Sequence, residues 1–203
     1  ICKIRVFDNL NRIHKKINKI YCIASKNYNQ NQWKEYINSL KIKNNNIINK
    51  VFYIQCQYNL ENYKLKLGNI IKNNTYIYVS TPPICYRDLL VFINEIDKGT
   101  LILEKPLALN YDDFKNIEPF LNNRTMMIDH FIFKTDIQKI FDYMSFKKKN
   151  LETVKKIQIV FHYENDVEDR LGFFDQCGFF VDMFQSHLLS IIYIIIGDNI
   201  NKI

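Results

Sequence analysis

Short apolar runs with the character of β-strands alternate with amphipathic segments along the first 125 residues of the chain. The four apolar runs are KIYCIAS (19–25), KVFYIQC (50–56), TYIYVS (75–80) and GTLILE (99–104). Apolar residues recur at helical spacing over residues 30–41, 58–71, 84–96 and 111–121. Strands that alternate with helices at such intervals favour a parallel sheet with crossover helices. We therefore predict an α/β fold, with a Rossmann-like parallel-sheet domain over residues 1–125.

The pattern changes after about residue 125. We expect a short strand in TMMID, a helix near 133–146, a longer strand in VKKIQIVFHYE and a helix over 178–196. This order of elements indicates the first part of a second, mixed α+β domain over residues 126–203. The segment KIKNNNIINK (41–50) is expected to be a polar loop.

Composition narrows the range of functions. The chain has 203 residues and a formal net charge of +7, which suits an anionic ligand. The basic residues are scattered and no nucleic-acid-binding signature occurs, so we do not expect a nucleic acid as a partner. The longest apolar run, residues 187–197, is too short to span a bilayer and predicts a buried helix. The five cysteines lie far apart without metal-ligand spacing, which indicates reduced thiols in a cytoplasmic setting and no metal site.

Lys105 stands in the segment EKP, at the end of the fourth predicted strand. Parallel α/β sheets bind their ligands at the carboxyl ends of the strands. A lysine at this place can therefore reach both a cofactor and a substrate. An ordinary charged turn would contain the same residue types, so both interpretations stay open.

His187 lies in a strongly apolar predicted helix. α-Helical spacing places Phe180 and Met183 on its face. A core histidine is one interpretation, and a catalytic base is the other. A base requires a carboxylate that orients its ring, and Asp129 at the end of a predicted strand is the candidate.

The residues that follow Asp129 suggest an anion site. His130 and Lys134 come directly after the predicted strand, and a lysine binds a phosphate as a point charge.

Several motifs resemble those of the glucose-6-phosphate dehydrogenase family. The segment IDHFIFK (128–134) is similar to the family's IDHYLGK, and FFDQCGFFVDMFQSHLL (173–189) is similar to YFDxxGxxxDxxQNHLL. STPPICY and LILEKP resemble the family's ALPPxxY and IVEKP, in the same order and at similar spacing. The resemblance covers nearly the whole chain, and the match at 173–189 is its most specific part.

The resemblance implies an enzyme that transfers hydride from C1 of glucose 6-phosphate to NADP and gives 6-phosphogluconolactone, the first step of the oxidative pentose phosphate pathway. His187 would be the base that takes the proton of the C1 hydroxyl, and Asp129 would orient it. The other implied substrate contacts are Lys105, His130, Lys134, Asp182 and, across a one-residue gap, Glu164. The implied cofactor contacts are Lys105, Tyr86 and Lys26. The full-length protein would be a homo-oligomer.

The chain departs from the family pattern at several positions. Phe131 replaces a tyrosine and so lacks a hydroxyl near the phosphate, and Phe133 replaces a glycine beside Lys134. Ser25 stands where an arginine would face the 2′-phosphate, with Lys26 next to it. The family's Gly-rich cofactor turn would fall before residue 1, and the later part of its substrate domain after residue 203. We therefore expect the chain to be a diverged fragment.

Two alternatives remain open from the sequence. STPP and EKPLAL fit the related Gfo/Idh/MocA sugar oxidoreductases equally well, although that family does not explain the IDH and FDxxG motifs. The aromatic replacements near Lys134 would also suit a non-catalytic paralogue that keeps the fold as a binding or assembly partner.

We expect these 203 residues alone to bind NADP weakly. Pyrophosphate binding in such folds depends on the backbone N–H groups of a Gly-rich turn at a helix N-terminus, and no such turn occurs in the sequence. Titration calorimetry with NADP on the folded chain measures the affinity. A sub-micromolar dissociation constant would contradict the expectation.

Overall fold

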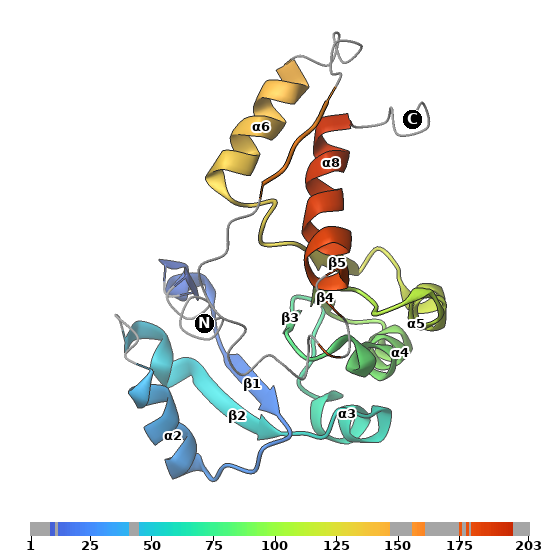
Figure 1. Cartoon of the computed structure of the whole chain (residues 1–203). Helices are drawn as coiled ribbons and strands as arrows, with labels where there is room; N and C mark the ends of the chain where they lie inside the picture. The colour runs from blue at the N-terminus through green and yellow to red at the C-terminus, as the bar shows by residue number, and fades with distance from the viewer. Residues whose placement is uncertain are drawn as a thin grey trace. The chain divides into compact units, whose positions relative to one another are not determined.

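The structure is a computed structural model that describes residues 9–10, 12–40, 45–146, 156–160, 175, 178 and 180–196. Figure 1 shows strands with helices between them along the chain. The described residues fall into two compact units. The first unit lies within Ile1–Lys72 and Asp88–Lys98, and the second within Asn73–Arg87 and Gly99–Ile203.

The first unit contains two parallel strands. β1 (Ile20–Ala24) and β2 (Val51–Gln55) pair in register, from Ile20 opposite Val51 to Ala24 opposite Gln55. The remaining elements that lie wholly in this unit are η1 (His14–Lys16), α2 (Gln30–Ser39), η2 (Asn45–Lys50) and α3 (Leu60–Leu67). α2 and η2 connect the two strands, as a crossover between parallel strands requires.

The core of this unit is aromatic. Trp33 and Ile37, four residues apart on α2, are buried together with Ile47 and Tyr53. The rings of Trp33 and Tyr53 stack with centroids 4.7 Å apart. The expectation of a polar loop over 41–50 is wrong for residues 45–50, which form η2 and bury Ile47 completely. Residues 41–44 lie outside the described part of the chain.

Asn29 starts α2 through a capping box. Its side-chain oxygen accepts from the backbone N–H of Gln32 at 2.9 Å, and the Gln32 side chain accepts from the Asn29 N–H at 3.0 Å. Two backbone donors that the helix leaves free are thereby satisfied.

The second unit contains a three-stranded parallel sheet. Its strands are β3 (Tyr76–Val79), β4 (Thr100–Glu104) and β5 (Thr125–Ile128), in the spatial order β3-β4-β5. The central strand β4 buries Leu101 and Leu103 completely. The other elements near the sheet in sequence are η3 (Pro83–Cys85), α4 (Tyr86–Ile96), α5 (Tyr111–Ile117) and η4 (Glu118–Phe120). Only the first two residues of α4 belong to this unit. The predicted α/β fold with parallel pairing is confirmed.

The C-terminal part of the described chain is helical. α6 (Thr135–Phe146) packs beside α8 (Leu189–Ile196), as Figure 1 shows in yellow and red. The nine residues before α8, Phe180–Leu188, form a π-helix (η7). The strand expected over 154–164 is wrong for residues 156–160, which have no regular structure, and residues 154–155 and 161–164 lie outside the described part.

Within the described residues, no helix combines the length and the apolar character needed to cross a membrane.

The sheet of the second unit fixes the place of two predicted site residues. β4 and β5 pair in parallel with Glu104 opposite Ile128. Lys105 and Asp129 are the next residues in the chain. Both therefore leave the sheet at the same carboxyl edge, where parallel sheets hold their ligands.

We expect Asn29→Ala to lower the free energy of unfolding of the first unit by about 1 kcal/mol, because the backbone N–H groups at the start of α2 lose their acceptor. Urea unfolding followed by the fluorescence of Trp33, the single tryptophan and a core residue of this unit, measures the change. The matched control is Asn31→Ala, an exposed position on the same helix, with an expected change within about 0.5 kcal/mol. Equal effects of the two substitutions would rule out the cap as the cause.

Candidate active site

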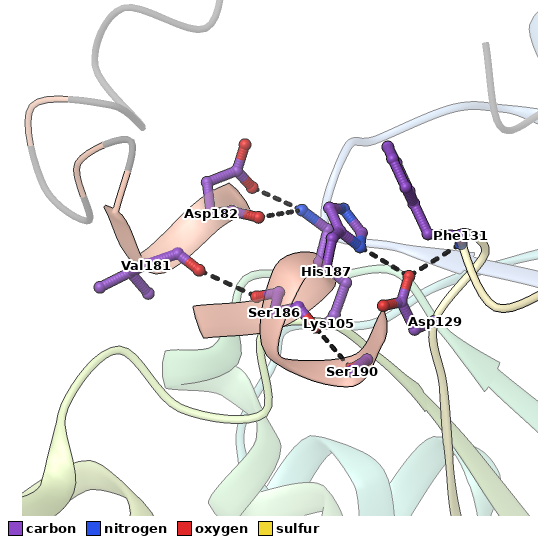
Figure 2. A network of polar contacts seen from close by, with 8 residues as sticks. All are labelled: Lys105, Asp129, Phe131, Val181, Asp182, Ser186, His187 and Ser190. Atoms are coloured by element: carbon purple, nitrogen blue, oxygen red, sulfur yellow. Dashed lines mark hydrogen bonds and ion pairs between the residues drawn. The ribbon is translucent and has the colours of Figure 1, made fainter. Parts of the chain in front are cut away.

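Asp129 and His187 meet in the interior of the second unit. His187 Nδ1 lies 2.7 Å from Asp129 Oδ1, and the two side chains are 1% and 5% exposed. The backbone N–H of Phe131 donates to the same carboxylate oxygen at 2.9 Å, as Figure 2 shows. The predicted contact between the two residues is confirmed. Because Nδ1 faces the carboxylate, Nε2 lies on the opposite edge of the ring, where a base would need it.

The contact of Asp129 with His187 is close but is not a well-aligned hydrogen bond. Asp129 Oδ2 and His187 Nδ1 both belong to the buried polar atoms that have no hydrogen-bond partner. Burial alone would raise the pKa of the Asp129 carboxyl, but the contact with His187 and the N–H of Phe131 outweigh it, so the pKa lies below its ordinary value. Asp129 is therefore an anion at neutral pH.

The π-helix sets the direction of His187. A π-helix closes its turn at i+5, and such turns are frequent at functional sites. Ser186 Oγ follows this spacing and donates to the carbonyl of Val181, five residues earlier, at 2.9 Å. The α-helical expectation that Phe180 shares the face of His187 is wrong, since Phe180 is 63% exposed while His187 is buried. Asp182, five residues before His187, is buried instead.

Lys105 binds Asp182. Lys105 Nζ lies 2.6 Å from Asp182 Oδ1 and donates to the Asp182 backbone carbonyl at 3.0 Å. The two side chains are only 10% and 3% exposed. Lys105 thus follows β4 into the interior and does not lie in an exposed charged turn. The two residues, both predicted to bind substrate, neutralise each other in this structure.

His130 and Lys134 lie close to the Asp129–His187 pair. The His130 ring is 4.9 Å from the His187 ring, and the Phe131 ring stacks on His187 with centroids 3.8 Å apart. Lys134 Nζ lies 3.5 Å from the centre of the Phe131 ring, in a cation–π contact. Burial, and next the charge of His187, hold the pKa of His130 below its ordinary value.

Phe131 is a contact residue that the sequence did not identify as one. Its aromatic ring was the available signal, but the comparison with tyrosine suggested only a lost hydroxyl. The structure shows that the ring is stacked between functional groups of the site.

Tyr86 is buried beside the end of β4. Its hydroxyl donates to the backbone carbonyl of Glu104 at 3.2 Å, and burial raises its pKa to about 12. The ring therefore supports the residue that precedes Lys105. Its expected contact with the cofactor stays a prediction.

Lys26 belongs to the first unit, where it follows β1. Its Nζ lies 4.7 Å from the centre of the Tyr28 ring, and its carbonyl accepts a hydrogen bond from Tyr53. A pocket of about 500 Å³ is lined by Lys26, Asn27, Tyr28, Gln32, Glu35, Tyr36 and Ser39. The pocket lies in the first unit and the Asp129–His187 pair in the second. Glu164, the remaining expected substrate contact, lies outside the described residues.

One possible metal cluster occurs among the described residues. Asp129, His130 and His187 each offer a ligand atom, and these atoms all lie within 4.8 Å of one another. The three residues are brought together by the fold and not by a spacing motif, so residue spacing alone does not predict this cluster.

Two family models match the chain. The model described as glucose-6-phosphate dehydrogenase, NAD binding domain, matches residues 5–139. The model described as glucose-6-phosphate dehydrogenase, C-terminal domain, matches residues 142–201.

Individual proteins are similar to the chain at low identity. Glucose-6-phosphate 1-dehydrogenase of Buchnera aphidicola subsp. Schizaphis graminum is 29% identical over 164 residues, which are 72% of this chain and 33% of the relative. Glucose-6-phosphate 1-dehydrogenase 6, cytoplasmic, of Arabidopsis thaliana is 26% identical over 151 residues, or 62% of this chain and 29% of the relative. The chain spans about a third of the length of the curated relatives it matches.

A crystal structure of glucose-6-phosphate 1-dehydrogenase from Mycobacterium avium has a similar fold. The TM-score is 0.74 at 18% identity, and the match covers 95% of this chain and 48% of the other.

We expect Lys105→Met to lower the free energy of unfolding by about 3–5 kcal/mol, because the buried Asp182 carboxylate loses its counter-charge. Urea unfolding followed by circular dichroism measures the loss. The matched control is Lys115→Met, which removes an exposed ion pair with Glu118 of similar length and is expected to cost less than about 1 kcal/mol. If Lys105→Met costs no more than the control, the pair is not the buried contact described above.

Proposed function

Because the chain belongs to the glucose-6-phosphate dehydrogenase family, we propose that it oxidises glucose 6-phosphate at C1, transfers hydride to NADP and releases 6-phosphogluconolactone. The observation that carries the proposal is the buried contact of Asp129 with His187 at positions that match the family's motifs. The sequence alternative of a Gfo/Idh/MocA oxidoreductase is set aside, because both family models belong to glucose-6-phosphate dehydrogenase.

His187 is the proposed base. Nε2, on the ring edge away from Asp129, accepts the proton of the C1 hydroxyl. The C1–O bond becomes a carbonyl as the C1 hydrogen leaves with its electron pair. Asp129 stays ionised and stabilises the imidazolium that forms, while the Phe131 ring holds the imidazole plane. Asp129 and Phe131 already contact His187 in the structure, so neither has to move to take these roles.

His130 and Lys134 are the proposed phosphate contacts. Lys134 is exposed and its ammonium lies over Phe131, so it can turn to a dianion without leaving a buried site. His130 lies beside the base at a ring distance of 4.9 Å, where a neutral imidazole can donate one hydrogen bond.

Lys105 and Asp182 are the proposed contacts for sugar hydroxyls near C1. Their ion pair holds a donor and an acceptor 2.6 Å apart, which suits a hydroxyl that both donates and accepts. Glu164 is proposed as a further substrate contact on the family resemblance alone.

The match to an NAD binding domain indicates a nicotinamide cofactor, and we propose NADP. When bound, the nicotinamide ring accepts the hydride. The residues present fit the adenosine end in part: Lys26 supplies a positive charge at the carboxyl end of β1, and Tyr28 supplies a flat ring beside a pocket of about 500 Å³. The carboxylate of Glu35, which lines the same pocket, would repel a phosphate. Lys105 and Tyr86 are proposed at the nicotinamide end.

The wider setting is also proposed. The parallel-sheet part would end near residue 125, and the residues that follow would begin the substrate domain. A homo-oligomer in the cytoplasm is supported by the family resemblance and by the name of the Arabidopsis relative. Cys22, Cys56 and Cys85 are not in disulfides, which suits a reducing compartment.

A non-catalytic paralogue is the second candidate. It is favoured by Phe131, which has no hydroxyl for the phosphate, and by Phe133, which is 68% exposed beside Lys134. Turnover of glucose 6-phosphate with NADP separates this candidate from the enzyme.

We expect His187→Asn to lower kcat by roughly 10²–10⁴ while the KM for glucose 6-phosphate changes little, because the base is lost and the phosphate contacts remain. Measuring kcat, KM and Tm together tests the assignment. An unchanged kcat in a stably folded variant would remove the base role, and a collapse of Tm would show a structural histidine.

We expect Lys134→Ala to raise KM more than it lowers kcat, because a phosphate contact binds the ground state and the transition state alike. The matched control is Lys139→Ala, a lysine on the exposed side of α6 with 74% of its side chain accessible. Equal KM values for the two variants would contradict the phosphate role.

A further inference from the structure

We propose that Asp129, His130 and His187 form a site for a divalent transition-metal ion, with zinc as the ion that suits them best. The three residues come from the end of β5 and from the π-helix, and their ligand atoms all lie within 4.8 Å of one another. Two imidazole nitrogens and one carboxylate oxygen form a ligand set that zinc accepts, with the fourth position open to water.

Two of the three ligands are buried and incompletely bonded. Asp129 and His187 are 5% and 1% exposed. Asp129 Oδ2 has no hydrogen-bond partner, and His187 Nδ1 makes the 2.7 Å contact with Asp129 Oδ1 without a well-aligned hydrogen bond. Buried polar atoms of this kind are rare in folded proteins, because desolvation without a partner costs free energy. A metal ion would satisfy Asp129 Oδ2 and would give His187 a better-aligned bond than it has in this structure.

The distances require only a small adjustment. Zinc binds nitrogen and oxygen at about 2.0–2.2 Å, so the ligand atoms of a tetrahedral site lie about 3.3–3.6 Å apart. His130 is the least buried of the three and can supply the movement by rotating its side chain. The carboxylate is already oriented by the Phe131 N–H, which provides the outer hydrogen bond that metal-binding carboxylates usually have.

The charges near the three ligands predict reversible metal binding and not a permanently bound structural ion. Asp129 is the only carboxylate in the ligand set. Asp182 neutralises Lys105, but the Lys134 ammonium over the Phe131 ring opposes a cation. A phosphate bound at Lys134 would remove this opposition.

A bound ion would inhibit the reaction, a consequence that rests on the proposed function. The ion occupies the imidazole and the carboxylate that the base and its orienting partner need. Zinc would therefore act as a reversible inhibitor of turnover, and a chelator would restore it.

The test begins with binding and needs no substrate. Zinc chloride is titrated into the whole chain in competition with a chromogenic chelator. His130→Gln is expected to weaken binding by at least about tenfold, since it removes one ligand. His14→Gln, a histidine of the first unit, serves as the matched control and is expected to change nothing. Circular dichroism confirms that each variant is folded.

Cobalt substitution identifies the ligand atoms. Cobalt bound at nitrogen and oxygen gives d–d absorption without a thiolate charge-transfer band, and this band separates the proposed site from binding at Cys22 or Cys85. A thiolate band, or equal zinc affinity in His130→Gln and the wild-type chain, would overturn the proposal.

Turnover separates this inference from the proposed function. Zinc binding that His130→Gln weakens, with no oxidation of glucose 6-phosphate by the wild type, would refute the function and leave the site standing. Normal turnover with no zinc binding would refute the metal site and leave the proposed function standing.

Discussion

The parallel pairing of β4 with β5 is the constraint on which the candidate site depends. The register sets Glu104 opposite Ile128, so the next residues, Lys105 and Asp129, leave the sheet side by side at one edge. A slip of one residue would turn the side chains of one strand to the other face. The buried Leu101 and Leu103 of β4 oppose such a slip, because it would expose them. Packing of the sheet thus fixes the positions of Lys105 and Asp129, although the sheet itself does not need these two polar residues.

The π-helix supplies the second half of the same arrangement. It brings Asp182 within 2.6 Å of Lys105 and His187 within 2.7 Å of Asp129. Five residues of an α-helix turn by about 500°, so the two side chains would diverge by about 140° and could not both reach this edge. The wider turn of a π-helix, which closes its hydrogen bond at i+5, rotates less per residue and so reduces that divergence. One buried ion pair and one buried histidine–carboxylate contact therefore join one helix to the ends of two neighbouring strands.

Much of this arrangement could be predicted from the sequence, because strand–helix alternation and strand-end polar residues leave local signals. The strands, the parallel pairing and the Asp129–His187 contact follow from such signals. The π-helix does not, because its residues are as apolar as those of an α-helix and the winding is decided by tertiary contacts. The burial of Ile47 could not be predicted for a similar reason. It lies in an asparagine-rich segment, and a single buried residue leaves no periodicity. The stacking of Phe131 on His187 depends on a contact between residues distant in sequence.

The contacts within the candidate site differ in strength. We propose that this difference sets the order in which the groups of the ligand bind. Breaking a buried ion pair such as Lys105–Asp182 costs about 3–5 kcal/mol. The cation–π contact of the exposed Lys134 is worth about 0.5–1 kcal/mol, less than a hydrogen bond to a charged group at about 1.5–3 kcal/mol. We therefore propose that Lys134 exchanges its partner first and that the phosphate is bound before the sugar reaches the buried groups. Binding at Lys134 also uncovers one face of Phe131 while the stack on His187 remains, so that the proposed base keeps its orientation as the substrate enters.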